Sequence, residues 1–297
     1  LGYQIFLPFN IGLFCILYNY YLCVYSNPGS VPKSWQPPTS FMRAAQESQE
    51  DIPLSTLAGK APTSSETTHL PLEPRYCRHC KTYKPPRAHH CKVCKRCVLR
   101  MDHHCPWVAN CVGHGNYAAF IRFLFAVDVT CIAHLVLLTL IVLDYWGVRT
   151  SGYFQPPSTP VLILILLNYI VCSIVLLLVG VFSLWHFYLL CSNMTTIESS
   201  EIERVETMIR RGRLKGRDVD FPFSLSLYSN ITAVLGRSPL TWCLPGASAL
   251  GDGLDFPTGE EILPEEQYAW PPRDPLKAMQ QHYSRQKIGA PGEQYSM

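Results

Sequence analysis

The apolar residues of this chain concentrate in three long runs that are separated by polar segments. The runs cover residues 1–25, 117–146 and 161–191. A helix needs about 20 predominantly apolar residues to cross the hydrocarbon layer of a bilayer, and each run reaches that length. The last run is the cleanest, because residues 161–190 contain no Asp, Glu, Lys or Arg. The pattern predicts a membrane α-helical protein with three spanning helices, since apolar core helices of a soluble enzyme rarely recur three times in one chain.

The polar segments between and after these runs predict different kinds of structure. Residues 26–74 are predicted to be a linker, which begins with a turn at residues 27–32. Residues 33–74 are rich in Ser, Thr, Pro, Gln and Glu and lack apolar periodicity, which favours flexibility. Residues 147–160 form a short loop between the second and third runs. Residues 192–297 begin with apolar side chains at helical spacing, typical of an amphipathic helix, and become loop-rich and partly disordered after about residue 244.

Basic residues predict which side of the membrane each segment faces. Nine Lys and Arg residues lie in the segment 75–100, and more follow the third run, whereas the loop 147–160 contains only Arg149. Cytosolic segments carry the excess of positive charge, so residues 75–116 and the C-terminal region are expected in the cytosol and the loop in the lumen. The Asn-x-Thr patterns that begin at Asn193 and Asn230 should then carry no sugar.

Seven of the thirteen cysteines lie in the segment 75–116, and their spacing is repeated. A C-x2-C-x9-H-x6-C pattern begins at Cys77, and an interleaved second copy begins fourteen residues later at Cys91. Each copy supplies three sulfurs and one imidazole, the ligands of a closed structural zinc site. The two predicted sets are Cys77, Cys80, His90 and Cys97, and Cys91, Cys94, His104 and Cys111. Disulfides are the weaker alternative, because the number of cysteines is odd and the cytosol is reducing.

One cysteine of this segment belongs to neither set. Cys105 begins no third copy, because Val108 stands where the next cysteine would be. His103 and Asp102 lie beside it, outside the predicted sets. An imidazole can remove a thiol proton and a carboxylate can stabilise the resulting imidazolium, so these groups are candidates for a nucleophilic catalyst. The plainer alternative is a buried thiol and a histidine that only hydrogen-bonds the loop, and spacing alone names no reaction.

The stretch from Arg75 to Phe120 closely resembles the cysteine-rich domain of the DHHC protein S-acyltransferases, also called palmitoyltransferases. It contains the signature Asp-His-His-Cys at 102–105, the following "PW", and "NCVGHGN" at 110–116. The resemblance implies that the family's two zinc sets coincide with those derived from the spacing. It also implies that the nucleophile is Cys105 and that His103 and Asp102 activate it.

Two further stretches extend the resemblance beyond the cysteine-rich segment. "TTIE" at 195–198 matches the family's Thr-Thr-x-Glu motif, which implies that Thr196 helps to position Asp102. "YSNITAVLG" at 228–236 is similar to a C-terminal family motif whose asparagine makes structural hydrogen bonds. The supporting residues implied by these motifs are Thr195, Thr196, Glu198 and Asn230. The amino-acid sequences of the cysteine-rich segment and of "RVETMIRRGR" are most similar to those of fungal endoplasmic-reticulum members of the family.

Some features depart from the family or lie outside its motifs. The family usually has four spanning helices, so a further helix before residue 1 would be needed to complete the lipid cavity. Its Asp-Pro-Gly turn is here Asn27-Pro28-Gly29, a change expected to affect local capping more than chemistry. Asp128 and His134 are ionisable residues within the second run, for which a structural pair or a polar contact between helices is favoured over catalysis.

The resemblance implies an enzyme, a protein-cysteine S-palmitoyltransferase. It would move a long-chain fatty acyl group, typically palmitoyl, from acyl-CoA through a Cys105 acyl-enzyme to cysteine thiols of proteins at the cytosolic membrane face. The implied cofactors and partners are two structural Zn²⁺ ions, fatty acyl-CoA, membrane protein substrates with cytosolic cysteines and the lipid bilayer, with no nucleic acid. The implied location is the endoplasmic reticulum membrane, with the Golgi or another endomembrane as alternatives. A membrane-anchored, RING-like zinc adaptor and a catalytically silent scaffold are the rivals from other classes.

Overall fold

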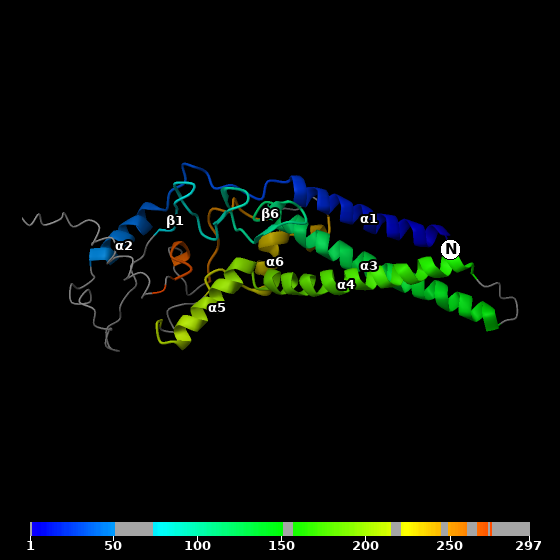
Figure 1. The fold of residues 1–297 in the computed structure, drawn as a ribbon. Helices are drawn as coiled ribbons and strands as arrows, with labels where there is room; N and C mark the ends of the chain where they lie inside the picture. Colours follow the sequence, from blue (N-terminus) through cyan, green and yellow to red (C-terminus); the bar gives the residue numbers. More distant parts are fainter. Residues whose placement is uncertain are drawn as a thin grey trace, which may run out of the picture.

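The structure, a computed structural model, is elongated, with three long helices at one end and short hairpins and shorter helices at the other (Figure 1). The residues it describes are 2–50, 74–150, 157–214, 221–244, 249–259, 266–272 and 274. The predicted flexibility of residues 51–73 and the predicted disorder of residues 275–297 concern segments outside these ranges.

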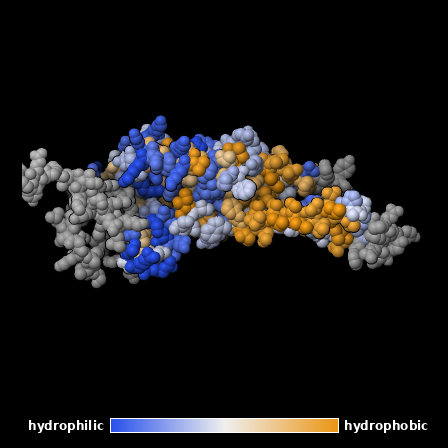
Figure 2. Space-filling model, in the orientation of Figure 1, coloured by the Kyte–Doolittle hydropathy of each residue, from blue (hydrophilic) through white to orange (hydrophobic). Residues whose placement is uncertain are grey.

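The long helices are α1 (Gly2–Tyr25), α3 (Tyr117–Thr150) and α4 (Thr159–Cys191), and α3 packs against both of the others. Each contains a segment long and apolar enough to cross a membrane: Leu7–Tyr25, Tyr117–Tyr145 and Thr159–Cys191. Figure 2 shows a continuous hydrophobic surface over these helices and a hydrophilic surface over the opposite end of the molecule. The predicted membrane α-helical fold with three visible spans is therefore confirmed.

Polar side chains join α3 to α4 inside the apolar region. The ring of His134 lies 3.3 Å from the amide oxygen of Asn168, and the hydroxyl groups of Thr139 and Tyr169 are 2.6 Å apart. Helices in membranes associate through such interhelical hydrogen bonds because the surrounding lipid supplies no hydrophobic drive. His134 therefore makes the polar helix contact that was expected of it.

Three antiparallel hairpins build the cysteine-rich segment. The first pairs β1 (Tyr76–Cys77) with β2 (Thr82–Tyr83), the second β3 (His89–Cys91) with β4 (Arg96–Val98), and the third β5 (His103–Cys105) with β6 (Asn110–Val112). None of these strands is longer than three residues, so the backbone ladders alone hold little structure. The turn at residues 27–29 closes over this segment, because the Gly29 carbonyl accepts a hydrogen bond from the amide of Leu99.

Two shorter helices connect the hairpins to the membrane end. α5 (Thr196–Arg210) follows α4 almost directly and is the amphipathic helix that the sequence predicts, with Val205 and Met208 on its buried side. α6 (Leu227–Leu235) packs against α4 and α3. Both helices therefore lie at the junction between the spans and the hairpins.

The prediction of a flexible linker over residues 26–74 needs correction for its first half. Residues 39–50 form helix α2 (Thr39–Glu50), whose Phe41 is completely buried. The ring of Phe41 lies 5.4 Å from that of Tyr268, which belongs to the C-terminal region. A short helix is stabilised mainly by packing an apolar face, and here that face meets a partner more than 200 residues away in the sequence. Composition alone therefore did not reveal it.

Candidate active site

The three hairpins have the same arrangement of turn and strands, and consecutive hairpins contribute to the same ligand set. This arrangement explains why the two Cys/His patterns are interleaved in the sequence. The turn of the first hairpin carries Cys77 and Cys80, and the strands of the second place His90 directly opposite Cys97. The turn of the second hairpin carries the next cysteine pair, and the strands of the third place His104 opposite Cys111. The first two hairpins thus each supply two turn cysteines to one set, and the second and third each supply a cross-strand His/Cys pair to the set begun by the preceding hairpin.

Both sets have the dimensions of a metal site. The three sulfurs of the first set lie 3.3–3.9 Å from Nδ1 of His90, and those of the second lie 3.5–3.7 Å from Nδ1 of His104. A tetrahedral zinc with ordinary bond lengths separates its sulfur and nitrogen ligands by about 3.6 Å. Each set could therefore hold one zinc ion, which would staple neighbouring hairpins together.

The third hairpin repeats the same turn without a second cysteine. Lys81, Lys95 and Ala109 occupy the equivalent position after each turn, and all three have a positive φ, between 48° and 56°. In the first two hairpins the turn amide donates to the leading cysteine sulfur, at 3.4 Å for Cys77 and 3.3 Å for Cys91. Cys105 leads the third turn, where the nearby amides of Trp107 and Val108 act to lower the pKa of its thiol. Cys105 thus begins a turn of the zinc-binding shape but lies outside both metal sets.

Asp102 and His103 lie beside this thiol. Nδ1 of His103 lies 2.6 Å from Oδ2 of Asp102, and the same imidazole acts on Cys105 by lowering the pKa of its thiol. Asp102 is buried to 1% exposure, whereas a quarter of the His103 side chain is accessible. The third turn and β5 therefore hold carboxylate, imidazole and thiol in the order that a thiol nucleophile needs.

The electrostatics of the line favour a thiolate–imidazolium pair. Burial raises the pKa of Cys105, but the hydrogen bond from His103 and the two turn amides outweigh it and lower the pKa below its ordinary value. Burial lowers the pKa of His103, yet its hydrogen bonds to Asp102 and Cys105 raise the pKa to about 9. For Asp102, burial raises the pKa, and the bond to His103, the nearby His186 and the Thr196 amide together lower it.

The start of helix α5 fixes Asp102 from the other side. The backbone amide of Thr196 donates to Oδ1 of Asp102 at 3.0 Å, and its hydroxyl donates to the Asp102 carbonyl oxygen at 2.6 Å. Thr195 and Glu198 close a capping box, in which each side chain accepts from the backbone amide of the other residue. A carboxylate at a helix N-terminus is stabilised by the free amides and the helix dipole. The TTIE motif therefore presents a preformed anion-binding helix end to Asp102.

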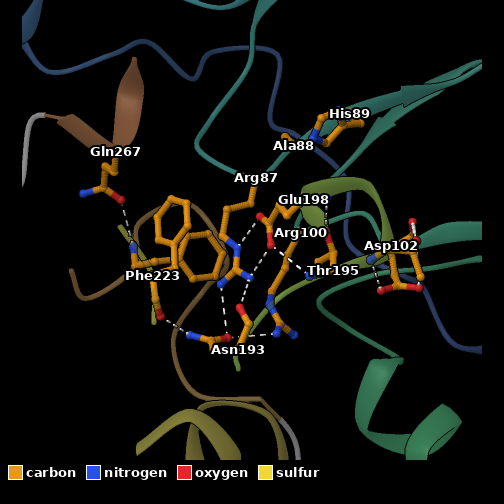
Figure 3. Close-up of polar contacts among 12 residues, drawn as sticks. Arg87, Ala88, His89, Arg100, Asp102, Asn193, Thr195, Glu198, Phe223 and Gln267 are labelled. Atoms are coloured by element: carbon orange, nitrogen blue, oxygen red, sulfur yellow. Dashed lines mark hydrogen bonds and ion pairs between the residues drawn. The ribbon is translucent and has the colours of Figure 1, made fainter. Parts of the chain in front are cut away.

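A buried network then joins α5 to the hairpins (Figure 3). The guanidinium of Arg87 forms two 2.7 Å bonds to the carboxylate of Glu198 and a 2.5 Å bond to the Asn193 carbonyl oxygen. The aromatic rings of Phe223 and Phe256 lie 4.6 and 4.9 Å from its central carbon. Phe256 comes from the loop-rich tail, so this part of the tail packs against the network. The network therefore fixes the start of α5, which holds Asp102, relative to the hairpins.

Asn230 links α6 to the end of the third span. Its side-chain amide donates to the carbonyl oxygens of Cys191 and Leu225, and its oxygen accepts from the amide of Leu225. These bonds satisfy a carbonyl group at the C-terminus of α4, which a helix leaves without an intrahelical donor. The hydrogen bonds of the Asn230 side chain are therefore all with backbone groups.

His186 is a residue near the site that the sequence reasoning missed. It lies on α4, ten residues before Thr196, and its ring centroid is 5.8 Å from that of His103. A nitrogen of His186, a nitrogen of His103 and an oxygen of Asp102 all lie within 4.8 Å of one another. The sequence does contain a signal for this residue, because a histidine within a spanning helix indicates a functional role.

The described residues thus bring together all the predicted site residues except Asn230, and they add His186. The arrangement can do one kind of chemistry well. A thiolate held by turn amides and an imidazolium can attack an electrophilic carbonyl carbon, and the imidazolium can return a proton to the leaving group. The hydrophobic side chains around Cys105, among them Val108, Tyr117 and Phe120, suit an apolar substrate.

Comparison with known proteins supports this reading of the site. Residues 71–203 match the family of DHHC palmitoyltransferases. The chain is 52% identical over 275 residues to Palmitoyltransferase PFA4 of Mycosarcoma maydis, which covers 92% of the chain. It is 33% identical to Probable protein S-acyltransferase 16 of Arabidopsis thaliana and 33% identical to Palmitoyltransferase PFA4 of Yarrowia lipolytica, each over 86% of the chain. The expected likeness to fungal members is therefore present.

The chain does not span the full length of all these relatives. It covers 56% of the Mycosarcoma protein, 65% of the Yarrowia protein and 80% of the Arabidopsis protein. The similarity nevertheless extends far beyond the cysteine-rich hairpins in each case.

Proposed function

This chain belongs to the DHHC palmitoyltransferase family, and from that premise we propose that it is a protein-cysteine S-palmitoyltransferase. It takes a long-chain acyl group from acyl-CoA onto Cys105 and passes it to cysteine thiols of other proteins. The observation that carries this proposal is the third hairpin, in which Cys105 leads a turn of the zinc-binding shape, has no place in either ligand set, and follows the hydrogen-bonded pair of Asp102 and His103.

The chemistry proceeds in two balanced half-reactions. The Cys105 thiolate attacks the thioester carbonyl of acyl-CoA, a new sulfur–carbon bond forms, and the bond to the CoA sulfur breaks. The departing CoA thiolate takes a proton from the His103 imidazolium. A substrate thiol then gives its proton to neutral His103 and attacks the acyl-enzyme, which frees Cys105. Asp102 keeps the imidazole oriented throughout through its bond to Nδ1.

The two Cys/His sets would each hold a structural zinc ion. All four ligands of each set come from the protein, so the ion would fix the hairpins and would leave no position for substrate. Without large apolar cores, hairpins of two or three residues per strand depend on such staples. The residues that hold zinc and the residues proposed to react are therefore separate.

The membrane contributes the acyl-chain environment. Cys105 belongs to one buried cluster with Cys23 of α1 and with Phe120 and Leu124 of α3, at the end of the spanning helices. Burial of each methylene of a fatty chain in an apolar environment is worth about 0.8 kcal/mol, so a long chain gains most from this position. By the positive-inside argument the site faces the cytosol, and we place the protein in the endoplasmic reticulum membrane, with proteins bearing cytosolic cysteines as acceptors.

Labelling of the thiol tests the function. The full chain in lipid nanodiscs is incubated with an alkyne-tagged palmitoyl-CoA, and the label is tested with hydroxylamine, which cleaves thioesters. We expect a hydroxylamine-sensitive label that is absent in Cys105→Ser and retained in the matched control Cys191→Ser, whose thiol lies outside both metal sets. Equal labelling of Cys105→Ser would refute the nucleophile, and an unlabelled wild type that holds two zinc ions per chain would favour an adaptor or scaffold.

A further inference from the structure

His186 is a fully buried imidazole with no hydrogen-bond partner among the described residues. Its exposure is 0%, and both ring nitrogens lack a donor or an acceptor within bonding distance in the described part of the chain. A buried polar group without a partner destabilises a protein relative to an apolar group of the same shape. The presence of an imidazole at this position therefore needs a reason other than packing.

The surroundings of His186 would accommodate a phenyl ring. The rings of Phe182, Phe120 and Tyr117 lie 4.4, 5.2 and 6.2 Å away between centroids, and the first two make interplanar angles of 64° and 75° with the imidazole. Such edge-to-face contacts are typical of phenylalanine clusters. If His186 only filled the space among these three rings, phenylalanine would be the more stabilising residue, because it carries no polar atoms to desolvate.

The polar atoms of His186 lie near the cluster formed by Asp102 and His103. Its nearest ligand atom is within 4.8 Å of the Asp102 carboxylate and of the His103 ring. The carboxylate already accepts from His103 and from Thr196, but it is 1% exposed and has no access to bulk water. Two hydrogen bonds of about 2.8 Å through one water, or a rotation of the side chain, would connect His186 to Asp102.

The proposed reaction creates a state in which another donor would stabilise Asp102. Before the reaction, the negative charge of Asp102 faces the positive charge of His103. When His103 gives its proton to the CoA thiolate, it keeps the Nδ1–H bond but loses its charge. The acyl-enzyme then holds a buried carboxylate beside a neutral imidazole, with the Thr196 amide and the Nδ1–H of His103 as its remaining donors, so a further N–H donor would offset part of the lost positive charge.

We propose that His186 is a positioning residue that donates a ring N–H to Asp102 in the acyl-enzyme, where it stabilises the carboxylate while His103 is neutral. This inference rests on the proposed acyl transfer and adds a residue to it. His186 touches neither thiol nor acyl-CoA in this role and acts through Asp102. The helix that carries the third span thus contributes directly to the stability of the intermediate.

The test compares the equilibrium between free and acylated enzyme in matched variants. The full chain in nanodiscs is equilibrated with fixed ratios of palmitoyl-CoA to CoA, and the acylated fraction is measured by intact-mass spectrometry. We expect His186→Phe to lower the acylation equilibrium constant by roughly ten- to hundredfold, the effect of losing one hydrogen bond to a charged group. At least one of His186→Asn and His186→Gln, which keep an N–H donor, should recover to within about threefold of the wild type.

Two readouts separate this role from a structural one. His186→Phe should retain both zinc ions and a melting temperature at least equal to that of the wild type, because it removes an unpartnered polar group. The control His134→Phe, the same exchange at the α3–α4 contact, should leave the acylation constant unchanged. An unchanged constant in His186→Phe would overturn the proposal, and so would an equally low constant in Phe, Asn and Gln variants that all retain zinc.

The experiment also distinguishes this inference from the function on which it rests. A wild-type chain that does not become acylated refutes the transferase itself. A wild-type chain that is acylated through Cys105, together with an unaffected His186→Phe variant, refutes only the role of His186. If the phenylalanine variant loses its zinc, His186→Met, an unbranched apolar replacement, takes its place in the same comparison with the two amide variants.

Discussion

The buried ion pair between Arg87 and Glu198 should be the most sensitive point in the connection between the hairpins and α5. Its side chains are 0% and 3% exposed, and both guanidinium–carboxylate distances are 2.7 Å. The two residues are 111 positions apart in the sequence, so the pair joins two separate segments. The perturbation we consider is replacement by methionine, singly and together, since methionine fills a similar volume without charge.

The structure sets the size of the expected effect. Loss of one partner leaves the other charge buried, which typically destabilises a protein by about 3–5 kcal/mol. Loss of both partners removes that penalty, so the double variant should be more stable than either single variant. The exposed pair of Glu201 and Arg204 on the same helix, with side chains 27% and 41% exposed, is the matched control. Surface pairs of that kind contribute about 0–1 kcal/mol.

Thermal unfolding in nanodiscs, followed by intrinsic fluorescence, measures this order of stability. We expect melting temperatures to fall in both Arg87→Met and Glu198→Met, to recover in the double variant, and to stay near the wild type in Arg204→Met. Acylation of Cys105 should fall even in the double variant, because the start of α5 that holds Asp102 loses its fixed position. Additive losses in the double variant, or a single variant as stable as the control, would refute the coupling.

Three other changes give direct readouts. Cys77→Ala should reduce the metal content from two zinc ions per chain and lower solubility, as measured by metal analysis of the purified chain; retention of two ions would show that the ligand set is wrong. Asp102→Asn should slow acylation of Cys105 by at least about a hundredfold, the scale of acid–base contributions, while zinc content is unchanged. Asn193 and Asn230 are each 2% exposed and hydrogen-bonded, so endoglycosidase treatment should cause no mobility shift; a shift would contradict both their burial and the cytosolic assignment.

The spacing of residues along the sequence was enough to predict the spanning helices, the two Cys/His ligand sets and the free cysteine. The three apolar runs predict the spans because bilayer thickness sets a minimum helix length. The two ligand sets follow from spacing because each hairpin turn is short and repeats after fourteen residues, so ligands close in space are also close in sequence. Cys105 was recognisable by subtraction for the same reason, and the structure adds that it leads a third turn of the same shape.

Contacts between distant segments were decided only by the tertiary structure. The partnership of Arg87 with Glu198, the docking of α2 on Tyr268 and the approach of His186 to Asp102 have no periodic signature, because nothing in a local pattern states which faces will meet. Short hairpins and helix ends gain their stability from whatever packs against them, so their partners emerge only when the whole chain is folded. The free thiol of Cys105 and the two Cys/His ligand sets are thus local properties of the sequence. The environment that orients Asp102 and His103 and sets their protonation states is a property of the fold.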